Sequence, residues 1–268
     1  MEDKYRKLQS RLRSLEGIAV AYSGGVDSTF LLQVASDLLA DRALAVTVVS
    51  PALPAGEMEA VVEFTRGRRI GHQVIELDQF AVEGFADNRV DRCYLCKRAY
   101  YPRILALARE RGIATVADGS NADDEADFRP GMRALKELGV ISPLQEAGLT
   151  KAEIRELSRA MKLPTWDKPD EACLATRIPY GEQITRSKLK RVDRAEQFLR
   201  GLGFRQVRVR CHGEMARIEI DPEERARFDK RLMDKVHDGL RTLGFTYVTL
   251  DLKGYRTGSL NENLERYT

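Results

Sequence analysis

The sequence predicts an α/β protein in which a doubly wound parallel sheet is followed by a smaller C-terminal α+β domain. In the first half of the chain, apolar runs rich in β-branched residues alternate with amphipathic helical segments, as expected for parallel strands covered by helices. The first apolar run leads through a glycine-containing turn into a helix, and doubly wound sheets bind ligands at such strand ends. Near the C-terminus, a basic helix is followed by two short alternating strands, a pattern typical of an α+β domain.

The elements of the first half follow from hydrophobic periodicity and from turn residues. Short apolar runs bounded by turn residues predict strands at 18–22, 43–49, 73–77 and 114–117. Apolar side chains at helical spacing predict helices at 5–15, 29–40, 57–70, 96–111 and 151–161. Thr150 and Glu153 form a capping-box pattern at the start of the last helix.

A segment without regular periodicity separates the two halves of the chain. Residues 163–181 contain three prolines and no helical spacing, and ordered loops of this length are often functional. We therefore predict a nucleotide-binding domain at 1–165 and a second domain at 166–268. The second domain is expected to contain a basic amphipathic helix at 185–202, strands at 206–211, 215–220 and 247–250, and a helix that begins at Asp221-Pro222.

Composition limits the classes of function. The chain has 268 residues, with 44 basic against 41 acidic side chains and a net charge of only +3, so a long nucleic-acid-binding surface is not required. No run of about 18 apolar residues occurs, and the charged N-terminus lacks an apolar signal core. These features predict a soluble, cytoplasmic protein with no membrane segment. Four cysteines in a reducing compartment indicate metal or redox chemistry rather than a disulfide framework.

The hexapeptide Ser23-Gly24-Gly25-Val26-Asp27-Ser28 links the first strand to a helix. Its glycines allow a sharp turn and a close approach to a ligand, and the first N–H groups of the helix form an anion site. The two serine hydroxyls add donors. A carboxylate at Asp27 would repel bound phosphates unless a cation lay between them, which predicts a Mg²⁺ ion at Asp27. An ordinary glycine-rich turn is the alternative.

Two stretches resemble nucleotide-binding loops of one superfamily. The hexapeptide resembles the SGGxDS motif of the PP-loop ATP pyrophosphatases, which cleave ATP between the α- and β-phosphates and adenylate a carboxylate or carbonyl oxygen. The turn at 119–124 matches the superfamily's second loop, commonly G-[TS]-N-x-D-D, although acidic turns are also common solvated loops. Lys97 is a weaker candidate, with a solvated lysine as the alternative. The resemblance implies that ATP is bound by Ser23, Gly24, Gly25, Asp27, Ser28, Gly119, Asn121 and Asp123, and Lys97 is added to this set because a cation is useful beside a triphosphate.

Cys173 is the most informative cysteine. It lies between Pro169 and Arg177 among charged residues, so we expect an accessible thiol whose thiolate is favoured by the arginine; a small buried residue is the alternative. The stretch at 172–181, ACLATRIPYG, and that at 251–261, DLKGYRTGSLN, resemble the LarE family over nearly the whole chain. That family comprises PP-loop sulfur transferases that help to assemble the nickel-pincer nucleotide cofactor of lactate racemase.

The resemblance implies an ATP-dependent sulfur transferase acting on a pyridinium dicarboxylic acid mononucleotide. ATP would adenylate a ring carboxylate with release of pyrophosphate, and sulfur would then displace AMP to leave a thiocarboxylate. Where the family has a lone cysteine at the Cys173 position, that residue surrenders its own sulfur by β-elimination and becomes dehydroalanine. An upstream carboxylase and a downstream nickel-inserting enzyme are implied as partners, and a homo-oligomer is expected.

The resemblance also suggests residues that contact the substrate. Arg177, beside the cysteine, is expected to act in catalysis by holding the substrate phosphate in its guanidinium fork. Arg208, Glu196 and Glu219 match, approximately, a region that the family uses around substrate and metal. Ordinary surface charges are the alternative for each of these three residues.

Cys93 and Cys96 distinguish this chain from the lone-cysteine form. Related members with such a C-x-x-C pair are thought to hold a [4Fe-4S] cluster on three cysteines, with one iron open to carry sulfide. We therefore expect Cys93, Cys96 and Cys173 to converge on the turn at 23–28, called the phosphate turn below, as cluster ligands. A zinc site with Cys211 or His212 as the missing ligand and a redox pair are the alternatives.

Two other functions remain open from the sequence. A PP-loop enzyme that thiolates tRNA would need a strongly basic face, and the one feature in its favour is the helix carrying Arg186, Lys188, Lys190, Arg191 and Arg194. An amidating synthetase, such as the NAD or GMP enzymes, would leave the cysteines unexplained. No glutaminase nucleophile domain is recognisable in the chain.

Overall fold

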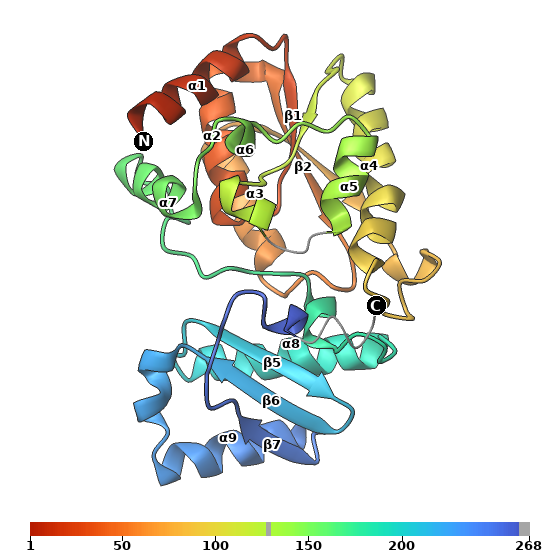
Figure 1. The fold of residues 1–268 in the computed structure, drawn as a ribbon, viewed down its shortest axis with the longest axis vertical. Coiled ribbons are helices and arrows are strands. Elements are labelled where there is room, and N and C mark those ends of the chain that lie inside the picture. Colours follow the sequence, from red (N-terminus) through yellow and green to blue (C-terminus); the bar gives the residue numbers. More distant parts are fainter. Residues whose placement is uncertain (127–129, 263–268) are drawn as a thin grey trace. The chain divides into compact units, whose positions relative to one another are not determined.

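A four-stranded parallel sheet organises the N-terminal part of the chain in the computed structural model, which describes residues 1–126 and 130–262 (Figure 1). The strand order is β3-β2-β1-β4. The strands are β1 (Ile18–Ala21), β2 (Ala43–Val49), β3 (Gly71–Glu76) and β4 (Val116–Ala117). Because β2 and β4 lie on opposite sides of β1, the winding changes direction at β1, and the end of this strand is where a doubly wound sheet binds its ligand.

Helices cover both faces of this sheet, so the predicted doubly wound α/β class is confirmed. The α-helices are α1 (Glu2–Arg13), α2 (Val26–Leu39), α3 (Glu57–Gly67), α4 (Arg92–Glu110), α5 (Pro130–Glu137), α6 (Pro143–Glu146) and α7 (Lys151–Ala160). Short 3-10 helices lie at η1 (Ala40–Arg42), η2 (Gln79–Ala81) and η3 (Ala122–Ala126). Helix α4 begins earlier than the sequence predicted, so both Cys93 and Cys96 lie within it.

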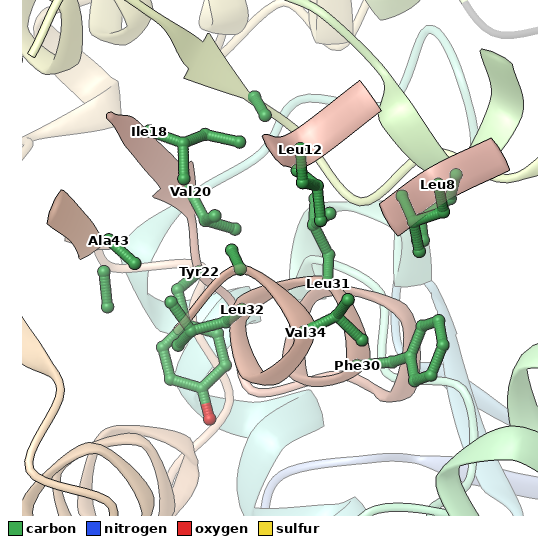
Figure 2. Packing of buried hydrophobic residues seen from close by; sticks show 14 of the residues in the cluster. Leu8, Leu12, Ile18, Val20, Tyr22, Phe30, Leu31, Leu32, Val34 and Ala43 are labelled. Carbon is green, nitrogen blue, oxygen red and sulfur yellow. The ribbon is translucent and has the colours of Figure 1, made fainter. Parts of the chain in front are cut away.

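Two hydrophobic clusters hold the layers together. One cluster packs α1, α2 and α7 against one face of the sheet, and Figure 2 shows Leu12, Val20 and Leu31 among its members. The other cluster joins α4 and α5 to the opposite face through residues such as Ile104 and Leu135. Helix α2 is buried along most of its length, so the phosphate turn at its start is carried by the best-packed element of the sheet layer.

A three-stranded sheet with two longer helices forms the smaller C-terminal part. Its strand order is β5-β6-β7, with β5 and β6 antiparallel and β6 and β7 parallel. The strands are β5 (Val207–His212), β6 (Met215–Ile220) and β7 (Tyr247–Leu250), and the helices are α8 (Arg186–Gly201), α9 (Lys230–Thr242) and the 3-10 turns η4 (Leu174–Arg177), η5 (Pro222–Arg227) and η6 (Ser259–Asn261). Helix α8 packs along β5 and α9 along β7. The predicted α+β class of this part is confirmed.

The helix predicted to begin at Asp221-Pro222 was placed wrongly. Asp221 caps only the short turn η5, where its carboxylate accepts the Glu223 N–H, and the α-helix begins after Asp229. The reason is tertiary packing: Phe228 leaves the helical conformation and stacks on Phe204, with 5.2 Å between the ring centroids.

The chain divides into two compact units. The first unit comprises Met1–Ser50, Ala55–Val82 and Cys93–Asp170, and the second comprises Pro51–Pro54, Glu83–Arg92 and the chain from Glu171 onward. The sequence predicted a division between residues 165 and 166, without the two short segments that join the second unit. Of the helices in the described part of the chain, none has the length and apolar character needed to cross a membrane.

The predicted capping box at the start of α7 is present. Thr150 Oγ1 accepts the Glu153 N–H, and the Glu153 carboxylate accepts the Thr150 N–H at 2.9 Å. Lys4 of α1 donates to the same carboxylate at 2.8 and 2.9 Å. The box therefore starts α7 and also attaches α1 to it.

Replacement of Glu153 by Gln should change how stability depends on pH. The hydrogen bonds from Lys4 and from the Thr150 N–H lower the pKa of Glu153 from 4.5 to about 2, so the folded carboxylate resists protonation longer than the unfolded one. The stability from its charge is fully present above pH 4.5 and is lost as the pH falls toward 2. Thermal melting should give a difference in Tm between wild type and Glu153→Gln that shrinks below pH 4.5. The same difference at every pH would contradict this account.

Candidate functional site

The phosphate turn has the backbone geometry of an anion site. Gly25 is the N-cap of α2 in an extended conformation, and no side chain caps the helix, so the first N–H groups of α2 have no intrahelical acceptor. Gly24 has a φ of +75°, and a Cβ atom there would lie 2.8 Å from Val61 Cγ2. Both the conformation and the space therefore require glycine. The hydroxyls of Ser23 and Ser28 lie 3.2 Å apart in the same turn.

The second predicted loop lies directly against this turn. A Cβ atom at Gly119 would lie 3.0 Å from the backbone nitrogen of Ser28, so the two loops meet only because Gly119 has no side chain. Asn121 Nδ2 donates to Asp27 Oδ2 at 3.3 Å, and Asp123 Oδ2 accepts the Lys151 N–H at 2.8 Å. Residues more than 90 positions apart in the chain thus form one polar surface at the end of β1.

Asp27 is paired with a lysine, Lys151, for which the sequence predicted no role in the site. Lys151 Nζ lies 2.8 Å from Asp27 Oδ2 and 2.9 Å from Asp170 Oδ1. Burial raises the pKa of Asp27, and Lys151 offsets part of that effect. Burial also opposes the charge of Lys151, but Asp27 and Asp170 outweigh it and raise the pKa of the ammonium. A lysine at the first position of a helix, where the dipole disfavours a cation, was the available sequence signal.

The carboxylate of Asp27 fits the predicted magnesium ion. Its Oδ1 atom is buried and has no hydrogen-bond partner among the described residues. A buried, unpartnered carboxylate oxygen is costly unless a cation or donor reaches it. Oxygen ligands of this kind are those that Mg²⁺ prefers.

A second lysine outside the motifs supports the turn. Lys168 Nζ donates to the Gly24 carbonyl at 3.1 Å and to Glu57 Oε2 at 2.7 Å. The segment that carries Lys168 is itself held by Arg155, whose guanidinium donates to the carbonyls of Trp166 and Lys168 at 3.0 and 2.8 Å. The irregular stretch after α7 is therefore attached to the phosphate turn within the first unit.

Lys97 lies along the strand end that precedes the second loop. Its side chain is only 24% exposed, with Nζ 3.9 Å from Asp118 Oδ2, and so it is not the solvated lysine considered as an alternative. The carboxylate of Asp118 also accepts hydrogen bonds from Ser120 at 2.5 Å and from Ser142 at 2.7 Å. A Cβ atom at Gly131 would lie 2.9 Å from Lys97 Cδ, so α5 packs closely on this lysine.

The three cysteines predicted to bind a cluster belong to different units. Cys93 and Cys96 lie one turn apart on α4 in the first unit, and Gln79 Nε2 donates to the buried Cys96 Sγ at 3.4 Å. Cys173 is exposed and belongs to the second unit. Over residues 1–126 and 130–262, no group of three or more His, Cys, Asp or Glu side chains is arranged to hold a metal ion. The [4Fe-4S] cluster stays a prediction.

Arg177 is an interior residue, contrary to its predicted role on the substrate phosphate. It is 0% exposed, and its Nε and Nη2 atoms donate to the two oxygens of Glu196 at 2.7 and 2.9 Å. Its Nη1 atom donates to the Ala172 carbonyl at 2.7 Å and to Thr176 Oγ1 at 3.0 Å. Because its donors are used within the second unit, Arg177 positions the turn that carries Cys173.

Glu196 is the acceptor at the centre of this arrangement. It is 0% exposed and also accepts the Val209 N–H at 3.0 Å and Arg200 Nη2 at 3.2 Å. Burial opposes its charge, but the pair with Arg177 outweighs burial and lowers the pKa of Glu196. Glu196 is thus a buried hub that joins α8, β5 and the Cys173 turn, and the surface-charge alternative does not hold for it.

Arg208 and Glu219 share the polar face of the second sheet. They are cross-strand partners on β5 and β6, and both are buried, so they are not surface charges either. Glu219 accepts Arg210 Nη2 at 2.8 Å and Arg217 Nη2 at 3.0 Å. Arg208 Nη1 lies 3.6 Å from Glu171 Oε2. Arg210 and Glu171 were missed from the sequence. The alternation of β5 was an available signal for Arg210, whereas Glu171 lies in the irregular stretch before η4.

Cys211 and His212, the alternative zinc ligands, lie at the end of β5. Arg191 Nη2 donates to the buried Cys211 Sγ at 2.9 Å. Burial raises the pKa of the Cys211 thiol, which disfavours the thiolate needed for metal binding. Burial also lowers the pKa of His212. Neither residue belongs to a metal-binding group in the part of the chain described.

Comparison with known proteins gives relatives that match almost the whole chain. No model of a protein family matches. An uncharacterized protein of Synechocystis sp. is 42% identical over 267 residues, covering 99% of this chain and 100% of the relative. Pyridinium-3,5-bisthiocarboxylic acid mononucleotide synthase of Lactiplantibacillus plantarum is 37% identical over 264 residues, covering 98% and 95%. The glutamine-hydrolyzing GMP synthase of Aeropyrum pernix is 30% identical over 209 residues, covering 69% of this chain but 40% of that protein.

Replacement of Arg177 by Met should strongly destabilise the second unit. Glu196 would then lose both hydrogen bonds from Arg177 and remain a buried charge that Arg200 compensates only in part. Loss of one partner of a buried pair costs about 3–5 kcal/mol. Denaturant unfolding followed by circular dichroism measures this loss. The double variant Arg177→Met with Glu196→Leu removes both charges and should recover most of it.

Arg194→Met is the matched control, because Arg194 is an exposed arginine on the same helix as Glu196. It should change the free energy of unfolding by less than about 0.5 kcal/mol. A similar small change in Arg177→Met would contradict the positioning role of the Arg177–Glu196 pair.

Proposed function

Because this chain belongs to the LarE family, that of the pyridinium-3,5-bisthiocarboxylic acid mononucleotide synthases, we propose that it is an enzyme that converts a carboxylate of a pyridinium dicarboxylic acid mononucleotide into a thiocarboxylate with the use of ATP. The observation that carries the ATP-dependent step is the meeting of two loops at the first turn of α2. That site combines the backbone N–H groups that begin α2, the hydroxyls of two serines and the Asp27 oxygen that has no hydrogen-bond partner among the described residues. This combination suits a metal-bound polyphosphate.

The first step is activation of the acid. The residues that would bind ATP are those of the two loops together with Lys97, and Mg²⁺ would be held by Asp27, where it neutralises phosphate charge. A substrate carboxylate oxygen attacks the α-phosphorus, and the bond between the α- and β-phosphates breaks to release pyrophosphate. The resulting acyl adenylate has AMP as its leaving group, whereas a free carboxylate would have to expel oxide or hydroxide. Glycine at position 119 matters here, because a larger residue would push the two loops apart.

The second step is sulfur transfer, for which Cys173 is the proposed donor. Its exposure in the second unit supports a reactive thiol. The Cys173 thiolate attacks the acyl carbon and AMP leaves with the bonding electron pair, which gives a thioester. Removal of the Cys173 Cα proton by a base then breaks the Cβ–S bond. The products are a thiocarboxylate and dehydroalanine at position 173, so each protein molecule would react once.

The buried arginines of the second unit serve this chemistry in two ways. Arg177 holds the carbonyls around Cys173 and keeps the turn in place. We propose that Arg208, whose Nη1 lies 3.6 Å from Glu171 Oε2, contributes its positive charge to the anionic substrate. Both oxygens of Glu196 and of Glu219 are engaged. We propose that Glu196 positions Arg177, and that Glu219 positions Arg210 and Arg217, rather than that either carboxylate touches the substrate.

The chemistry of substrate and product places the enzyme between two other reactions. A ring dicarboxylate requires a carboxylating enzyme before it, and a thiocarboxylate, a soft sulfur ligand, suits a nickel-inserting enzyme after it. A homo-oligomer in the cytoplasm stays our prediction.

The tRNA alternative was favoured by the basic helix α8. Two of the basic side chains on this helix are engaged within the protein. Lys188 donates a hydrogen bond to Glu182 at 2.7 Å, and Arg191 donates to the carbonyls of Gly213 and Gly244.

Turnover of ATP by Asp27→Asn tests the activation step. Purified protein with Mg²⁺, ATP and the pyridinium dicarboxylic acid mononucleotide should release AMP and pyrophosphate. Asp27→Asn should release pyrophosphate at least about 100-fold more slowly, because a ligand to the cation is lost. Asp37→Asn is the matched control at the far end of α2, where Asp37 contacts Gln33, and it should keep the wild-type rate. Formation of ADP by the wild type would contradict the proposed function.

Mass spectrometry of the protein after one turnover tests the sulfur source. If Cys173 donates its sulfur, residue 173 loses the mass of one H₂S, and a Cys93→Ala, Cys96→Ala double variant still makes product. Cys173→Ser should release pyrophosphate without forming a thiocarboxylate. An intact chain with product, together with iron in anaerobically purified protein and failure of the double variant, would instead favour the predicted cluster.

A further inference from the structure

Lys151 occupies an unusual position between two carboxylates in the first unit. Its Nζ atom lies 2.8 Å from Asp27 Oδ2, in the first turn of α2, and 2.9 Å from Asp170 Oδ1. Its backbone N–H donates to Asp123 of the second nucleotide loop at 2.8 Å. The first residue of α7 is therefore attached to both loops of the proposed ATP site, through its backbone to one and through its side chain to the other.

The ammonium group is not needed to build α7. The capping box of Thr150 and Glu153 already satisfies the start of this helix, and a cation at a helix N-terminus is disfavoured by the helix dipole. The pair of Lys4 with Glu153 is structural by contrast, because the Glu153 carboxylate to which Lys4 donates also accepts the Thr150 N–H and so belongs to the capping box. The side chain of Lys151 instead contacts Asp27, whose other oxygen, Oδ1, is buried and has no hydrogen-bond partner among the described residues.

The charges around the turn show what Lys151 must do when a nucleotide binds. Asn121 donates a hydrogen bond from its side chain to Asp27 and another from its backbone N–H to Asp124. The carboxylate of Asp170 contacts Lys151, so three carboxylates lie around the turn. A cation that takes Asp27 would stand next to the ammonium and repel it, unless an anion came between them. A phosphate group of the nucleotide is such an anion. Without Lys151 it would face Asp170 with Arg155, whose Nη2 lies 3.5 Å from Asp170 Oδ1, as a more distant cation.

We propose that Lys151 is a nucleotide-binding residue, which neutralises Asp27 in the protein without ligand and donates to a phosphate of ATP once a divalent cation has taken Asp27. This inference rests on the proposed function, since it assigns a further contact in the same ATP site. Asp170 keeps the ammonium near the turn during the exchange, because it contacts Lys151 independently of Asp27. No chemical bond is made or broken in this step.

Binding measurements without the acid substrate test the proposal. Calorimetry with Mg²⁺ and the non-hydrolysable analogue α,β-methylene-ATP should give an affinity for Lys151→Met at least about tenfold below that of wild type, because a charge-assisted contact to phosphate is lost. Mg²⁺ alone, followed by the shift that it causes in Tm, should bind Lys151→Met more tightly than wild type, because the ammonium no longer competes for Asp27. Weaker binding of the analogue together with tighter binding of Mg²⁺ in Lys151→Met would show that Lys151 moves from Asp27 to a phosphate when the cation binds.

Control variants separate this role from a structural one. Lys4→Met also removes a lysine that pairs with a carboxylate at the N-terminal end of α7 and should bind the analogue within about twofold of wild type. Lys151→Gln keeps a donor for Asp27 without the charge, so it should fold even if Lys151→Met does not, and it should show the same tenfold loss.

The outcomes distinguish the inference from the function on which it rests. If wild type binds the analogue and both Lys151 variants bind it equally well, or if they bind Mg²⁺ and the analogue equally weakly, the inference is overturned and the proposed function stands. If wild type itself does not bind the analogue, the proposed function fails and the inference fails with it.

Discussion

The close approach of two loops at the start of α2 is the constraint on which the first unit depends. A Cβ atom at Gly119 would lie 3.0 Å from the Ser28 backbone nitrogen, so any side chain there would require the Ser28 backbone to shift. That contact brings Asn121 to Asp27. Helix α2 is buried along most of its length, so packing holds the N–H groups at its start in position. Preorganised donors of this kind cost no reorganisation when charge arrives.

Charge balance around that turn comes from residues outside the nucleotide motifs. Lys151 pairs with Asp27 and Asp170, and Lys168 pairs with Glu57 while it donates to the Gly24 carbonyl. An acidic cluster of this density would repel a polyphosphate if it stood alone. The lysines allow the same surface to accept both a cation and an anion, which an enzyme that handles a metal-bound nucleotide requires.

In the second unit, the exposed thiol of Cys173 lies on a turn with little regular structure, which must be held in place by other residues. Buried charge holds this turn: Arg177 and Glu196 are both fully buried, and the arginine donates to the Ala172 carbonyl beside Cys173. Such pairs gain little net stability, because burial of both charges is costly, but loss of one partner is severe. A geometry held this way is well defined, which suits the role in sulfur transfer that we propose for Cys173.

The sequence by itself determined the alternation of strands and helices, the glycines of the phosphate turn and the capping box of α7, since each depends on residues a few positions apart. Only the tertiary structure decided that Lys151 pairs with Asp27, 124 positions away in the chain, and that Arg177 is buried in a pair with Glu196. It also decided that α9 begins beyond Phe228, whose ring stacks on Phe204. The physical reason is range. Periodicity and backbone conformation are encoded locally, whereas the partner of a buried charge is set by which distant elements the packing brings together.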